Sequence, residues 1–265
     1  MDVSELANAE QKQRVWERVN FALSYPFIAP EHDYAFYRDH ALEILEFRGE
    51  DPRDWRVLLG GDAARLGDLL ESDEVASAPL SDLTPVIASG SNASPLQLNR
   101  KFHDLEKALC PCFRVTLPGY EARYAAHIAP YGSVPASLER AEGREGTFFV
   151  SFLPQSFLEL MNRTESLGRY YNLIQIDNLS IERPGLSWRG AALGYASATG
   201  LLRDEAGAAP LALAEASQWR AQTAAIRHLQ ERISVQDFVR QNIFDVQTRL
   251  TREALLAQAM SSVAE

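Results

Sequence analysis

PVIASGSNASP, residues 85–95, is the stretch that decides the fold of this chain. Residues 86–88 are apolar and include two β-branched side chains, which favour a strand. Gly90 then favours a turn, since glycine adopts backbone conformations that other residues resist. Ser94 is a good helix N-cap, and Gln97 lies three residues later, where it can complete a capping box. The stretch therefore predicts a strand, a turn and a helix start. Backbone N–H groups of such a turn can hold a carboxylate or an oxyanion.

Short β-rich runs continue from residue 83 to about residue 197, with turns between them. Helices are expected to interrupt them after Ser94 and after Pro154. The expected strands are residues 86–88, 113–117, 124–128, 147–152, 170–176 and 190–196. This mixture predicts an α+β fold, with a mixed β-barrel or sheet as its core.

Helical spacing of apolar residues predicts helices on both sides of that core. Before it, the spacing covers Val15 to Leu23 and Tyr34 to Leu45. After it, a loop at residues 200–210 leads to further helical segments, one of them capped by Ser234 with Asp237. We therefore expect three parts: a helical N-terminal extension at 1–80, the core at 81–200, and C-terminal helices at 201–265 that pack on the core.

Composition restricts the classes of function. The 265 residues carry a formal net charge of −10, which argues against nucleic acid or an anionic membrane surface as the main partner. The acidic N-terminus does not resemble a signal peptide, and no apolar run is long enough to span a bilayer, so the cytoplasm is the expected location. Cys110 and Cys112 are one residue apart and have no further ligands at metal spacing, so we expect reduced, structural thiols and no metal.

A second segment, from residue 147 to residue 176, has to be considered together with residues 85–95. A strand at residues 147–152 is followed by a helix after Pro154, by Glu165 near the end of that helix, and by an aromatic-led strand from Tyr170. This order resembles the gamma-glutamylcyclotransferase family. The turn Gly90-Ser91-Asn92 resembles the family's Tyr-Gly-Ser-Asn motif, residues 131–138 resemble the segment before its central strand, and Tyr195 resembles a tyrosine of its late strand. The resemblance covers about residues 83–200.

The resemblance implies an enzyme that cleaves a γ-glutamyl amide by attack of its own α-amine, releasing 5-oxoproline and an amine without a cofactor. Glu165 occupies the place of the general acid/base. The implied substrate-binding residues are Ser89, Gly90, Ser91, Asn92, Tyr171 and Tyr195. The implied partner is a small γ-glutamyl compound, and the helical extensions could support a homodimer.

One position departs from the family pattern. Ser89 stands where the family has tyrosine, whereas Asn92 agrees with the Gly-Ser-Asn branch rather than the glutathione-specific Gly-Ser-Leu branch. Ser89 leaves room for an aromatic residue from the N-terminal part (Trp16, Tyr34 or Tyr37) or for a bulkier substrate. The missing hydroxyl could also come from Tyr131 or Tyr124, or the activity could be lost. Two other functions therefore stay open: another acyl-transfer or lyase reaction on a larger metabolite, and a non-catalytic binding or assembly module.

Overall fold

The computed structural model describes residues 3–72, 77–103, 105 and 109–261. The chain divides into two compact units, and each unit combines stretches that are distant in sequence. Unit 1 comprises Met1–Pro26, Ala122–Ser137 and Ser197–Glu265, and unit 2 comprises Phe27–Glu121 and Leu138–Ala196. The division between Ala196 and Ser197 lies close to the boundary expected near residue 200, whereas no division falls near residue 80.

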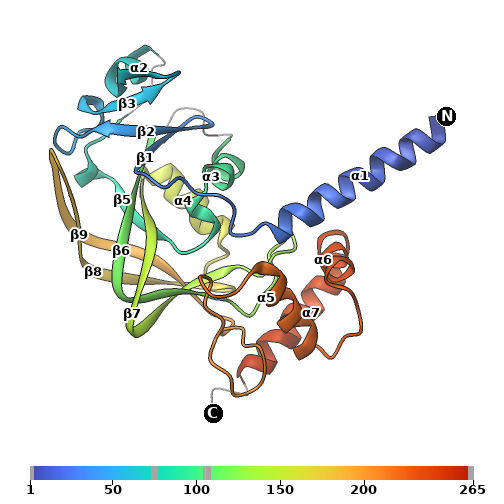
Figure 1. Ribbon diagram of the computed structural model, residues 1–265. Coiled ribbons are helices and arrows are strands. Elements are labelled where there is room, and N and C mark those ends of the chain that lie inside the picture. Colours follow the sequence, from blue (N-terminus) through green and yellow to red (C-terminus); the bar gives the residue numbers. More distant parts are fainter. Residues whose placement is uncertain (1–2, 73–76, 104, 106–108, 262–265) are drawn as a thin grey trace. The chain divides into compact units, whose positions relative to one another are not determined.

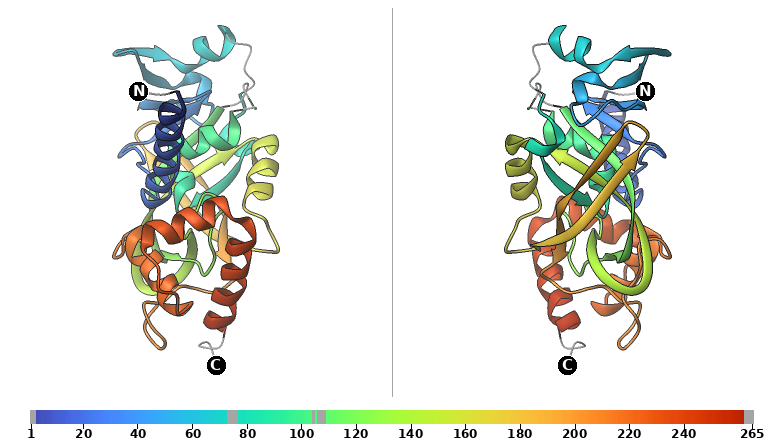
Figure 2. Two further views of the ribbon diagram at one scale, coloured as in Figure 1. Left: turned by 90° about the vertical axis from the view of Figure 1, so that its right-hand side faces the viewer. Right: turned by 90° about the vertical axis from the view of Figure 1, so that its left-hand side faces the viewer.

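Unit 2 holds most of a nine-stranded mixed sheet with the order β4-β3-β2-β1-β6-β7-β5-β9-β8 (Figure 1). β5 pairs antiparallel with β7 and parallel with β9. β8 and β9 form one long hairpin that turns at residues 184–185 (Figure 2). The strands are β1 (Tyr34–Tyr37), β2 (His40–Glu46), β3 (Arg56–Leu59), β4 (Asp62–Arg65), β5 (Thr84–Ala88), β6 (Leu109–Tyr124), β7 (Ala136–Leu153), β8 (Tyr171–Arg183) and β9 (Leu186–Ser197).

Seven α-helices occur among the described residues, so the α+β prediction is confirmed. The expected barrel is not confirmed by the strand order, in which β4 and β8 are the two ends. The helices are α1 (Val3–Leu23), α2 (Leu66–Ser72), α3 (Pro95–Phe102), α4 (Gln155–Thr164), α5 (Gln218–His228), α6 (Val235–Phe244) and α7 (Val246–Ser261).

One face of the sheet in unit 2 packs against α3 and α4. The stacked rings of Phe102 on α3 and Phe157 on α4 join the two helices, with centroids 4.1 Å apart. Successive strand residues point to opposite faces, so Val86 and Ala88 of β5 contribute to this core. The buried cluster is Tyr34, Phe36, Val86, Ala88, Leu98, Phe102, Cys110, Cys112, Phe149, Leu153, Phe157, Met161, Tyr171 and Tyr195.

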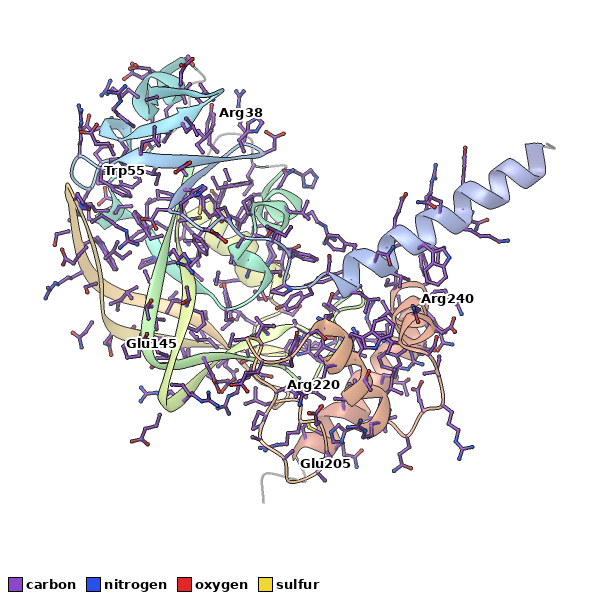
Figure 3. The ribbon with its side chains drawn as sticks, viewed as in Figure 1. Arg38, Trp55, Glu145, Glu205, Arg220 and Arg240 are labelled. Atoms are coloured by element: carbon purple, nitrogen blue, oxygen red, sulfur yellow. The ribbon has the colours of Figure 1, made fainter. Side chains whose placement is uncertain are left out.

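Aromatic side chains fill the core on the opposite face. Phe113 packs against Phe47, Trp55 and Phe152, and Phe152 in turn packs edge-on against Trp188 at 4.9 Å. Trp55, labelled in Figure 3, is fully buried and donates its indole N–H to the Gly49 carbonyl at 2.9 Å. The donated hydrogen bond satisfies the one polar group of this indole.

The helical character expected for the N-terminal extension is wrong for Tyr34 to Leu45, which form the hairpin of β1 and β2. All four residues of β1 are buried between β2 and β6. The hairpin turns between Tyr37 and His40, with Arg38 at a φ of 53°, and its strands pair in regular antiparallel register. Pairing with β6, more than sixty residues later, decides the structure here, and local periodicity cannot detect such a contact.

In unit 1, α6 contacts α1, α5 and α7. Two buried glutamines of α5 satisfy the backbone of the segment at residues 132–134. Gln218 both accepts from the Val134 N–H and donates to the Val134 carbonyl, each at 2.9 Å, and Gln222 donates to the Gly132 carbonyl at 2.8 Å. The predicted cap of α6 is confirmed, since Ser234 accepts from the Asp237 N–H at 3.1 Å.

Candidate functional site

Residues 85–95 form the predicted strand, turn and helix start. After β5, a 3-10 turn at Ser91–Ala93 leads into α3, and the Ala93 N–H donates to the Gly90 carbonyl at 3.1 Å. The N–H groups of Ser91 and Asn92 open this turn and so have no acceptor within it. Gly90 has a φ of −150°, so it is not in the left-handed region that favours glycine.

The capping box expected at Ser94 is wrong. The Gln97 N–H donates to the main-chain carbonyl of Ser94 at 3.0 Å instead of to its hydroxyl. The Ser94 hydroxyl is buried and has no hydrogen-bond partner. The backbone of Ser94 is extended, as in other N-caps, so α3 still begins at Pro95.

An aromatic residue from the N-terminal part does reach this turn. Tyr34 of β1 donates its hydroxyl to the Ala93 carbonyl at 3.0 Å, and its ring packs against Phe149 at 5.4 Å. Burial, and then the nearby Cys112, raise the pKa of Tyr34, so the hydroxyl stays protonated and able to donate. Tyr34, one of the three candidate aromatics, thus contacts the turn beside Ser89.

Glu165 lies at the end of α4 and faces the turn. Its own N–H donates to the Met161 carbonyl at 2.9 Å, and the helix stops because Ser166 takes a φ of 51°. The Glu165 Oε1 accepts a hydrogen bond from the Asn92 side-chain amide at 3.0 Å. Two predicted site residues that are far apart in the sequence are therefore in direct contact.

A lysine that the sequence analysis missed completes this contact. Lys101 of α3 donates from its Nζ to the same Oε1 of Glu165 and lies 3.2 Å from the Met161 sulfur. The side chains of Lys101 and Glu165 are only 8% and 15% exposed, so this ion pair is nearly buried. The signal was available: Lys101 stands three residues after Leu98 and beside Phe102, on the buried stripe of its helix.

Two predicted tyrosines lie on the neighbouring strands β8 and β9. The rings of Tyr171 and Tyr195 pack edge-on with centroids 6.1 Å apart, and both residues are buried. Tyr195 donates its hydroxyl to the Asn162 side-chain oxygen at 2.7 Å, a contact that the sequence analysis also missed. Burial, and then the carboxylate of Glu165, raise the pKa of Tyr195.

The structure thus brings a carboxylate, an ammonium, a side-chain amide and a phenol together inside unit 2. Asn92 holds the carboxylate with its nitrogen, while its buried oxygen has no hydrogen-bond partner. Ser89 and Gly90 lead directly into this cluster from β5. Such a set can bind a polar group that carries charge and can move a proton at the carboxylate.

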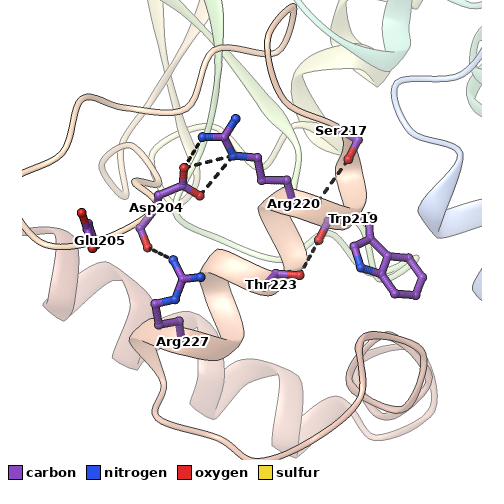
Figure 4. Close-up of a pocket in the computed structure, with 7 residues that line it drawn as sticks. All are labelled: Asp204, Glu205, Ser217, Trp219, Arg220, Thr223 and Arg227. Carbon is purple, nitrogen blue, oxygen red and sulfur yellow. Dashed lines mark hydrogen bonds and ion pairs between the residues drawn. The ribbon is translucent and has the colours of Figure 1, made fainter.

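A hollow of about 540 Å³ in unit 1 is a second place where polar side chains gather (Figure 4). Arg220 forms an ion pair with the Asp204 carboxylate, and Arg227 donates to the Asp204 carbonyl at 2.7 Å. Two arginines therefore face Asp204 and Glu205, and the charges of the lining cancel. This arrangement ties the loop at residues 200–210 to α5, and it offers less chemistry than the Glu165 cluster.

Other sequence predictions can be placed in the described part of the chain. Cys110 and Cys112 are buried free thiols with sulfurs 3.7 Å apart, as expected. No group of three or more His, Cys, Asp or Glu side chains in the described residues is arranged to hold a metal ion. Nor does any helix in these residues have the length and apolarity needed to cross a membrane.

Comparison with solved structures gives a weak likeness. No family model matches the chain, and neither does any curated protein. A solved structure described as "Gamma-glutamyl cyclotransferase" is similar with a TM-score of 0.36 and 11% sequence identity, over 64% of this chain and 86% of that chain. A likeness of this size assigns neither a family nor an activity to the chain, so the function is argued from the site residues.

Proposed function

We propose that this chain is a gamma-glutamylcyclotransferase-like enzyme that cleaves γ-glutamyl amides in unit 2. The observation that carries the proposal is the contact between Glu165 and Asn92. By resemblance, Glu165 corresponds to the general acid/base of the family, and Asn92 belongs to the turn that corresponds to its substrate-binding motif. The hydrogen bond connects these two elements. The order of sequence motifs that led to these two residues supports the same reaction.

The chemistry needs a single carboxylate. The α-ammonium of the γ-glutamyl group gives a proton to Glu165, and the freed amine attacks the γ-carbonyl carbon. A C–N bond forms in the five-membered ring, and the C–N bond to the departing amine breaks. Two of the three ammonium protons end on the departing amine, one after the other through Glu165, and the third stays on the lactam nitrogen of 5-oxoproline. The attack is intramolecular, so the site mainly selects the bent conformer and moves protons.

The other residues would hold the reacting group. In this proposal the N–H groups of Ser91 and Asn92 receive the γ-carbonyl oxygen as it gains charge. Tyr171 and Tyr195, whose rings pack against each other, would line the pocket and hydrogen-bond the glutamyl group. The test is the release of 5-oxoproline from a panel of γ-glutamyl amides with small and large amine halves. No 5-oxoproline from any member of the panel would overturn the proposal.

A specific observation favours a second candidate, a non-catalytic binding module. The Glu165 carboxylate already has two donors within the protein, Asn92 and Lys101, so its charge is compensated without a substrate. In that case γ-glutamyl compounds would bind in unit 2 and remain intact. Calorimetric binding together with product analysis separates the two candidates.

Replacing Tyr195 with Phe should lower turnover about fivefold, because the phenol hydroxyl, which here donates to Asn162 and is proposed to bind the glutamyl group, is lost. The shape of the pH profile between about pH 6 and about pH 9 should not change. The pKa of Tyr195 is raised, so its hydroxyl stays protonated throughout this range and contributes no titration. A shift of the pH profile in the Phe variant would contradict the statement that the Tyr195 hydroxyl does not titrate in this range.

Replacing Ser89 with Tyr should penalise γ-glutamyl amides of large amines more than those of small amines. Ser89 is partly buried next to the turn that Tyr34 contacts at Ala93, and a new ring at position 89 would narrow the space for the substrate. The measurement is kcat/KM for two substrates that differ only in the size of the amine. Equal losses for both would remove the argument that Ser89 sets substrate size.

A further inference from the structure

The Lys101–Glu165 ion pair is unusual because it consists of two opposite charges that are nearly buried. Lysine is almost never buried unless it is paired, and taking two charges out of water costs more than packing two apolar side chains in their place. Apolar side chains adjoin the pair: Met161 touches Lys101, while Phe102 and Phe157 stack between the same two helices. Two apolar side chains at positions 101 and 165 would fit this packing, so the ion pair as a whole is not explained by stability.

The charges indicate what kind of ligand could open this pair. A ligand that brought only a cation to Glu165 would place two ammonium groups beside one carboxylate, and the like charges would repel. A ligand that brought only an anion would leave Glu165 without its cation. A group that carries an ammonium and a carboxylate on the same carbon exchanges partners with both residues and leaves no charge unpaired.

We propose that Lys101 binds the α-carboxylate of the γ-glutamyl group, while Glu165 takes the α-ammonium. This inference rests on the proposed function and adds a side chain that is absent from the motifs that led to it. The position of Asn92 supports it, since its side-chain amide and the Lys101 ammonium meet at the same carboxylate oxygen. A carboxylate on Lys101 therefore lies next to the turn that ends β5.

The test compares two substrates that differ only in this group. A γ-glutamyl amide has the α-carboxylate, whereas the 4-aminobutanoyl amide of the same amine lacks it and closes to 2-pyrrolidinone by the same attack. Lys101→Met should lower kcat/KM for the γ-glutamyl amide by about tenfold or more, the scale of a hydrogen bond to a charged group. It should raise kcat/KM for the 4-aminobutanoyl amide, because the second cation that repels its ammonium is gone, and Lys101→Arg should restore part of the difference. Equal losses on the two substrates would overturn the role of Lys101.

Binding separates failure of this inference from failure of the proposed function. If the wild-type protein cyclises neither amide, the proposed reaction is wrong, and the carboxylate site is then judged from 5-oxoproline and 2-pyrrolidinone binding by calorimetry. The site stands if wild-type protein prefers 5-oxoproline and Lys101→Met loses that preference. It is overturned if the preference is unchanged or if neither compound binds.

A second pair of variants keeps the experiment interpretable if Lys101→Met folds poorly with an uncompensated carboxylate. Glu165→Gln retains the lysine, and Glu165→Gln combined with Lys101→Met retains neither charge. We expect 5-oxoproline to bind the single variant at least about tenfold more tightly than the double variant. Equal affinities would overturn the inference, and circular dichroism checks that both variants are folded.

Discussion

Replacing Glu165 with Gln should reduce the release of 5-oxoproline by about 100-fold or more, the usual effect of removing a positioned acid/base. The amide is close in size to the carboxylate but cannot take the proton of the substrate ammonium. The measurement is kcat for the best γ-glutamyl amide of the panel. Turnover equal to that of the parent would exclude Glu165 as the proton-transfer group.

The Glu165 variant needs a control for stability, because Lys101 is nearly buried against it. Breaking a buried ion pair on one side costs about 3 to 5 kcal/mol, since the remaining charge has no partner. The double variant Glu165→Gln with Lys101→Met removes both charges, so it should regain much of the lost free energy of unfolding. It should remain inactive, and a stable but inactive double variant would show that the lost activity is not an effect of unfolding.

Replacing Arg252 with Met should destabilise unit 1 by about 3 kcal/mol. The Arg252 side chain is 5% exposed, and its guanidinium donates to both Glu231 carboxylate oxygens at 2.7 and 2.6 Å. It also donates to the side-chain oxygens of Asn242 and Gln241, so its removal leaves several acceptors without a donor. Chemical denaturation followed by circular dichroism measures the change, because α5, α6 and α7 belong to this unit.

Arg240 provides the matched control for that experiment. It lies on α6, labelled in Figure 3, and pairs with Asp237 at 3.1 Å with both side chains about half exposed. Exposed pairs of this kind contribute little, so Arg240→Met should change the free energy of unfolding by at most about 0.5 kcal/mol. Similar losses for Arg252→Met and Arg240→Met would contradict the assignment of Arg252 as a buried cross-link between α6, α7 and Glu231.

Local sequence patterns were sufficient to predict a strand or helix wherever the segment itself contains the residues that mark its ends. The runs that became β5, β7, β8 and β9 are β-rich and bounded by turn residues, and Pro95 and Pro154 mark helix starts. The expected strand at 124–128 mostly lies beyond the end of β6 at Tyr124, where the chain enters unit 1. The hairpin of β1 and β2 was missed because burial against β6 outweighs the local spacing.

The sequence by itself determined the strand, turn and helix around Gly90, the helix ending near Glu165, and the tyrosines on two late strands. These features depend on residues that are neighbours in the chain, where propensity and capping act. Only the tertiary structure decided that Asn92, Lys101 and Glu165 share one carboxylate oxygen, and that Tyr34 supports the turn from β1. The physical reason is that α3 and α4 pack against each other through Phe102 and Phe157. This packing brings the Lys101 ammonium and the Glu165 carboxylate, from separate helices, into contact at a nearly buried position.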